Sequence, residues 1–206
     1  METDQTSIAD LKLLIAPGSL PFFATLLQAG IEIEGGTEES IGVFLARLPG
    51  FTAEYIATTV QTIFLNGVAT DNLETPLHGN PPVLAISAAM PGLAGAIFRK
   101  NSFHAALRTE HPLAEASTGS SRTKVTLKLF NVIARDCGAN LLRRGVTIAS
   151  AHLRDFLLSR ASLLAHIRQT IFAGSLTDPA DLLPRLADQQ TLHLIIDEDH
   201  DPSAAC

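Results

Sequence analysis

The side chains best suited to chemistry follow two glycines in the segment 88–126. The candidate ligand-binding residues are Gly92, Gly95, Arg99, Lys100, Ser102, His104 and Arg108. Pro91 suits a helix start, and the exposed amides there, with Arg99 and Lys100 nearby, could hold an anion. Alternatively, the glycines allow close packing and Ser102 caps a second helix. Neither a phosphate-loop spacing nor a dinucleotide fingerprint is present, which favours packing.

A second candidate for phosphate is the run TGSSRT at 118–123. Successive backbone amides in such a run can cradle an anion. A flexible linker has the same composition, and we favour that interpretation because the run lies between two similar parts of the chain. The run 118–123 therefore predicts a boundary between these two parts of the chain.

Metal ligands and nucleophiles give weaker signals. The seven histidines do not pair at the spacing of a helical metal site. The acidic run 197–201 could bind a divalent cation, although such runs are usually solvated tails, so we predict no specific metal. Apolar neighbours of Cys137 should raise its pKa, and no GxSxG turn occurs. The sequence leaves catalytic residues and cofactors undetermined.

Composition limits the partners. A formal charge of −6 with scattered basic residues predicts no nucleic acid partner. The most apolar run, 83–98, is interrupted by Pro91 and is shorter than the roughly 20 residues of a membrane helix. Two cysteines outside any CxxC pair and an acidic start without a signal-peptide pattern predict a cytoplasmic protein.

The stretch QTIF occurs at 61–64 and again at 169–172, which suggests a duplication. Other matches follow in the same order with a slowly shrinking offset: Leu11-Lys12-Leu13 with Leu127-Lys128-Leu129, Leu26-Leu27 with Leu141-Leu142, Gly30 with Gly145, Phe44-Leu45 with Phe156-Leu157, and Leu84 with Leu192. The alternative is that apolar periodicity aligns by chance. We interpret residues 1–87 as a first copy, 88–126 as a unique connecting segment and 127–206 as a second copy.

Each copy is predicted to place a helix against a small sheet. In the second copy, 124–130 alternates like a strand, although a helix could begin within it, and a helix should follow. The sequence then predicts a strand at 145–148, an N-cap at Ser150, a helix, and strands at 168–172 and 191–196. In the first copy, Asn66-Gly67 predicts a two-residue hairpin.

This order, with the phrases IFLNGVATDNLETPLHGNPPVLAIS and KVTLKLFNVIARDCG, resembles the ubiquitin-like (β-grasp) sulfur-carrier proteins of molybdopterin and thiamine synthesis. The resemblance covers most of each copy and implies a β-grasp-like α+β fold for it. From the duplication, we predict that the two copies are related by an approximate two-fold axis. Those carriers end in a Gly-Gly whose carboxylate is adenylated, whereas this sequence ends DPSAAC. The resemblance therefore implies the fold and not the carrier activity.

Two functions remain open. The first is a non-catalytic binding or protein-interaction module, whose partner is another protein or a second copy of the chain. The second is a small-molecule enzyme or anion-binding protein with its site at the junction of the two copies. In both, we expect 90–108 to pack against that junction and to contact the ligand or partner.

Overall fold

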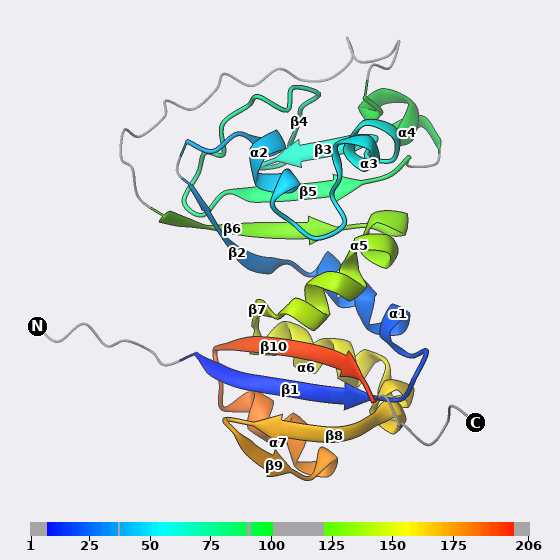
Figure 1. Cartoon of the computed structure of the whole chain (residues 1–206), viewed down its shortest axis with the longest axis vertical. Helices are drawn as coiled ribbons and strands as arrows, with labels where there is room; N and C mark the ends of the chain where they lie inside the picture. Colours follow the sequence, from blue (N-terminus) through cyan, green and yellow to red (C-terminus); the bar gives the residue numbers. More distant parts are fainter. Residues whose placement is uncertain (1–7, 37, 90–91, 101–121, 200–206) are drawn as a thin grey trace, which may run out of the picture. The chain divides into compact units, whose positions relative to one another are not determined.

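The computed structural model describes residues 8–36, 38–89, 92–100 and 122–199 (Figure 1). Helices and strands are mixed along the chain, which confirms the α+β class. The chain divides into two compact units, described separately below. Unit 1 comprises residues 1–26 and 142–206, and unit 2 comprises residues 27–141.

Unit 1 is built on a mixed sheet. Its strands are β1 (Ala9–Ile15), β7 (Val146–Ala149), β8 (Ile167–Phe172), β9 (Ser175–Thr177) and β10 (Thr191–Glu198). They lie in the order β7-β10-β1-β8-β9, where β1 and β10 are parallel and the other neighbours antiparallel. Leu11, Leu13 and Ile15 alternate with less buried residues, so one face of β1 packs into the core.

Short helices complete unit 1. They are α1 (Leu20–Phe23), α6 (Ser150–Ser159), α7 (Leu182–Ala187) and the 3-10 helices η1 (Ala24–Gln28), η3 (Ala161–His166) and η4 (Pro179–Asp181). Figure 1 shows α6 and α7 on the same face of the sheet. Leu153, Phe156 and Leu157 of α6 are buried, as the predicted helical stripe requires. The last residues of η1 belong to unit 2.

The described residues of unit 2 also form five strands. They are β2 (Ile31–Gly36), β3 (Thr62–Leu65), β4 (Val68–Ala69), β5 (Val83–Ser87) and β6 (Arg122–Leu129). Their order is β4-β3-β5-β6-β2, with β5 and β6 parallel and the other neighbours antiparallel. The helices are α2 (Ile41–Ala46), α3 (Ala53–Thr58), α4 (Gly92–Phe98) and α5 (Asn131–Arg144), whose last residues belong to unit 1.

Local predictions are mostly confirmed. Asn66 and Gly67 join β3 to β4 with φ values of 52° and 82°, the positive pair that a two-residue hairpin needs. The expected strand and helix around residue 130 are β6 and α5. The N-cap prediction at Ser150 is wrong. Ala149 occupies that position, and the buried Ser150 hydroxyl instead donates to the Leu186 carbonyl at 2.6 Å.

The compact units do not coincide with the two predicted copies. Strand β1, from the first copy, pairs with β8 and β10 of the second, and β6, from the second copy, pairs with β2 and β5 of the first. Both predicted copies hold five strands with helices between the first three, but η4 and α7 separate β9 from β10, whereas no helix is described between β4 and β5. Their last strands take different neighbours, because β5 lies beside β3 whereas β10 lies beside β7. The duplication and its two-fold axis therefore stay predictions.

Candidate functional site

The structure describes four of the seven predicted ligand-binding residues. Gly92 begins α4 with φ +74° and open space around it, and Gly95 is buried. Arg99 and Lys100 follow the end of α4. The other three, Ser102, His104 and Arg108, lie outside the described residues.

The two halves of the predicted anion site lie at opposite ends of α4. A helix of this length extends about 10 Å, and its unpaired amides are at the Gly92 end. At the other end, Arg99 Nε donates to Gln61 Oε1 at 3.2 Å and the Lys100 amide donates to the Gln61 carbonyl at 2.6 Å. The Phe98 ring lies 5.2 Å from that of Phe64 on β3. These contacts are those of a helix packed on a strand.

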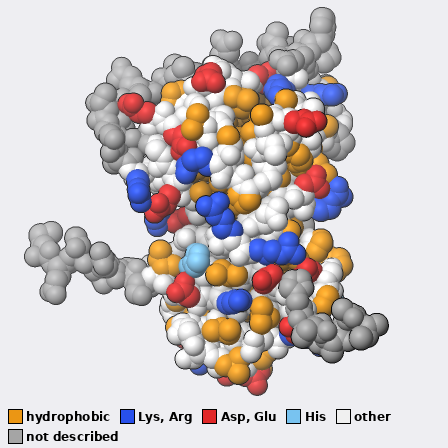
Figure 2. All heavy atoms as spheres, viewed as in Figure 1, with side chains coloured by type: hydrophobic (Ala, Val, Ile, Leu, Met, Phe, Trp, Pro, Cys, Tyr) orange, Lys and Arg blue, Asp and Glu red, His pale blue; other side chains and the backbone are white. Residues whose placement is uncertain are grey.

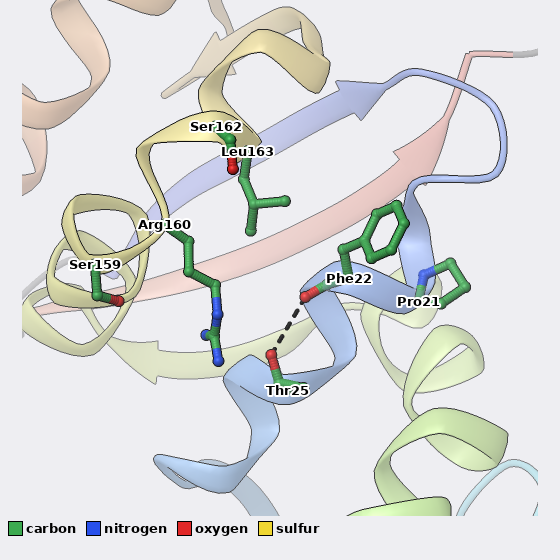
Figure 3. A pocket seen from close by; sticks show the side chains of 7 residues that line it. All are labelled: Pro21, Phe22, Thr25, Ser159, Arg160, Ser162 and Leu163. Carbon is green, nitrogen blue, oxygen red and sulfur yellow. Dashed lines mark hydrogen bonds between the residues drawn. The ribbon is translucent and has the colours of Figure 1, made fainter.

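An open pocket in unit 1 has the lining of a binding site. Its volume is about 400 Å³, and its walls come from α1, η1, the end of α6 and η3. The lining residues are Pro21, Phe22, Thr25, Ser159, Arg160, Ser162 and Leu163 (Figure 3). Helix α6 ends at Ser159, and Arg160 has φ −135° and ψ 58°, so the chain turns there and η3 forms the facing wall.

The apolar part of the lining contains an aromatic ring open to solvent. Phe22 is 55% exposed, whereas its neighbour Phe23 is fully buried. Leu163 is 6% exposed and lies between Arg160 and Phe22 in Figure 3. Two lining hydroxyls are turned toward the backbone, since Thr25 donates to the Phe22 carbonyl at 3.3 Å and Ser159 donates to the Phe156 carbonyl at 2.9 Å.

The charged part of the lining is Arg160. Its guanidinium carbon stands 4.7 Å from the centre of the Phe156 ring, a cation–π contact that orients the side chain. Within the described ranges, no carboxylate lies within 4.0 Å of this guanidinium. The pocket therefore offers one cation beside an apolar wall.

Helix α1, which carries Phe22, is held by contacts on both sides. The buried Ser19 hydroxyl is 2.8 Å from His166 Nδ1, and the Phe22 ring lies 6.0 Å from the His166 ring. The Leu20 amide donates to Glu198 at 3.3 Å, and Arg143 donates to the same carboxylate at 3.0 Å. These contacts fix the position of the exposed ring.

The Ser19–His166 pair has the residue types of a nucleophile and its base. Ser19 is only 3% exposed, so a substrate cannot reach its hydroxyl in this conformation. The neighbouring Leu20 amide, which would be an oxyanion donor, is bonded to Glu198. The pair therefore anchors the loop between β1 and α1.

Cys137, which the sequence analysis considered as a nucleophile, is buried in unit 2. Burial raises the pKa of its thiol to about 11, which confirms the expected effect of its apolar neighbours. Burial likewise raises the pKa of Tyr55, whose hydroxyl donates to Asp136 at 3.1 Å. Both groups are protonated at neutral pH, and neither lines the pocket.

Charge and metal ligands give no competing site in the described part of the chain. Figure 2 shows acidic and basic side chains intermingled on one face. Across the described residues, no three histidine, cysteine or carboxylate side chains gather as metal ligands. None of the described helices combines the length and apolar character needed to cross a membrane.

Sequence reasoning missed the pocket, although one signal was present. Phe22 and Phe23 are adjacent in a helical segment, and adjacent residues point about 100° apart. A narrow apolar stripe cannot bury both rings, so one of them had to face outward.

Comparison with models of protein families, with curated proteins and with solved structures found no match.

Proposed function

We propose that this chain is a non-catalytic protein-binding module, and that its partner contacts the pocket around Phe22 in unit 1. The observation that carries the proposal is the exposed Phe22 ring, held in place at the rim of the pocket. Covering a phenylalanine side chain contributes about 1.5–3 kcal/mol. Exposed aromatic and arginine side chains beside a hollow have the composition of an interface hot spot.

We also propose that the module consists of two ubiquitin-like copies. Support comes from the helices that separate the first three strands of each copy and from the QTIF matches, which fall at Gln61 and β3 in one copy and within β8 in the other. Each unit adds a mixed sheet with one parallel pair among its central strands. A cytoplasmic location, inferred from cysteine use, belongs to the same proposal.

The test compares two exposed apolar side chains. Phe22→Ala removes the ring in the pocket, and Val43→Ala is the matched control, because Val43 is 56% exposed on α2 of unit 2. Proteins captured from extract by the wild-type chain are identified, purified and titrated against each variant. We expect Phe22→Ala to weaken the complex by about tenfold or more and Val43→Ala to leave it unchanged.

A second copy of the chain is tested in the same way. Light scattering after size-exclusion chromatography gives the mass of the wild-type protein and both variants over a concentration series. Self-association through the pocket would be lost in Phe22→Ala alone. Equal partner affinity for Phe22→Ala and the wild type, in both assays, would refute the proposal.

A further inference from the structure

Arg160 differs from Arg143, an arginine of unit 1 that is held by carboxylates. Arg143 donates to Glu198 at 3.0 Å and also lies 3.5 Å from Asp197. Arg160 instead stacks on Phe156, with no carboxylate of the described residues within 4.0 Å. Stacking leaves the edge of a guanidinium available, and that edge presents paired N–H donors that match a carboxylate.

The apolar wall lies next to this cation. Pro21, Phe22 and Leu163 line the same pocket, and Figure 3 shows Leu163 between Arg160 and Phe22. The pocket of about 400 Å³ has room for one side chain. A ligand that fits both parts therefore needs an apolar group and a carboxylate a short distance apart.

We infer that the pocket binds a segment of a partner protein that presents an apolar side chain next to an acidic one. This inference rests on the proposed function. The apolar side chain covers Phe22 and Leu163, while the carboxylate accepts hydrogen bonds from Arg160. A chain segment matches the site better than a small molecule, because it can continue over the rim and cover the exposed Phe22 ring, whereas small ligands are usually enclosed by their pockets.

The probes are two tetrapeptides that differ in one group. The first is glycyl-leucyl-glutamyl-glycine with acetylated and amidated ends, and the second replaces the glutamate with glutamine. Each is titrated into the full chain labelled with ¹⁵N, and amide shifts are followed at 22–25 and 159–163. We expect saturable shifts there, with the glutamate peptide binding about threefold to fivefold more tightly at low salt, as an exposed ion pair implies.

Two matched variants separate the charge from the fold. Arg160→Gln should abolish the preference for glutamate while leaving the binding of the glutamine peptide unchanged. Arg154→Gln makes the same charge change at an exposed position of α6, the helix that ends just before Arg160, and should keep the preference. Phe22→Ala should weaken both peptides to the same degree, and its spectrum verifies that it is folded.

The outcomes distinguish this inference from the proposed function. Equal affinity for the two peptides, or a preference for glutamate that survives Arg160→Gln, would refute the inference that the partner segment is acidic. The proposal of a partner that binds through Phe22 would be unaffected. Absence of saturable shifts at millimolar peptide also overturns it. Binding of acetate alone with the same affinity as the glutamate peptide would show a small-anion site instead. If the affinity for the captured partner protein does not change in Phe22→Ala, the proposed function itself is refuted.

Discussion

Unit 1 and unit 2 have the same succession of strand pairings but assemble it from different parts of the chain. From β7 to β9 and from β2 to β4, neighbouring strands pair antiparallel, parallel, antiparallel and antiparallel. Unit 2 is one continuous segment, whereas unit 1 combines residues 1–26 with 142–206. The same pattern of parallel and antiparallel pairs thus forms from two different orders of strands along the sequence.

The central parallel pair makes the difference clear. In unit 2 it is β5 with β6, and β6 lies beside β2. In unit 1 it is β10 with β1, and β10 lies beside β7. Each unit therefore takes one central strand from the predicted copy that does not supply its other strands. The boundaries of the compact units thus differ from those of the predicted copies.

The largest expected effect comes from cutting the chain in two ways. A fragment of residues 27–141 keeps all five strands of unit 2, whereas a fragment of residues 1–87 keeps the first copy but lacks β6. We expect the first to be folded and the second to be unfolded, because in the second fragment β2 loses β6, β1 loses β8 and β10, and β5 keeps only β3. Circular dichroism and the dispersion of amide signals in NMR spectra show whether each fragment is folded. A cooperatively folded 1–87 fragment would contradict it.

Core truncations sharpen the same comparison. Leu11 in β1 and Leu127 in β6 occupy matching positions in the two copies, and both are fully buried. Each change to alanine should cost about 2–5 kcal/mol. Hydrogen exchange should show that Leu11→Ala lowers protection in unit 1 and that Leu127→Ala lowers it in unit 2. The reverse assignment would mean that the strands belong to their sequence copies.

A pH dependence is expected in unit 2 because of Cys137. Its folded-state pKa of about 11 lies above the ordinary 9.0, so its contribution is fully present below pH 9 and is lost as the pH rises toward 11. Cys137→Ala should reduce the loss of stability over this interval by about 1–2 kcal/mol, because burial opposes ionisation of the thiol in the folded protein. Urea unfolding at pH 8, 9, 10 and 11 measures the difference. Parallel curves for the two proteins would exclude this role.

The smallest effect concerns one threonine in each QTIF match. Thr62 Oγ1 and Thr170 Oγ1 are buried without a hydrogen-bond partner among the described residues. Replacement by valine removes an unsatisfied hydroxyl at nearly constant volume, so Thr62→Val and Thr170→Val should each stabilise their unit by about 1 kcal/mol. Thr177→Val is the control, because Thr177 donates to the Ser175 carbonyl at 3.2 Å and should lose stability. Destabilisation by both test substitutions would indicate an internal partner for these hydroxyls.

Local structure was largely predictable because its causes are local. Asn66-Gly67 can adopt the positive φ values of a hairpin, and alternation along β6 matches a strand with one buried face. The error at Ser150 shows the limit of such reasoning. A serine before a helix suits an N-cap. Here Ser150 is instead the first residue of the helix, and its buried hydroxyl donates to the carbonyl of Leu186 on another helix.

The strand exchange could not be predicted from the sequence. Strands β1 and β6 contain the same Leu-Lys-Leu pattern with the leucines buried, so either strand suits either central position. The choice depends on pairings across the whole chain, which periodicity does not record. The pocket was hidden for a similar reason, since its lining comes from residues 21–25 and 159–163.

The parallel pairing of β1 with β10 has a consequence for the protein during its synthesis. Ala9 is paired with Leu192, so β1 leaves the ribosome long before its partner exists. At 5–20 residues per second, the interval is about 10–35 s. Throughout it, the backbone edge of β1 that pairs with β10 has no partner and is a target for chaperones or for β1 of another nascent chain. Unit 2 can complete its sheet once β6 has emerged, so the order of translation makes unit 1 the part of the molecule most exposed to misassembly.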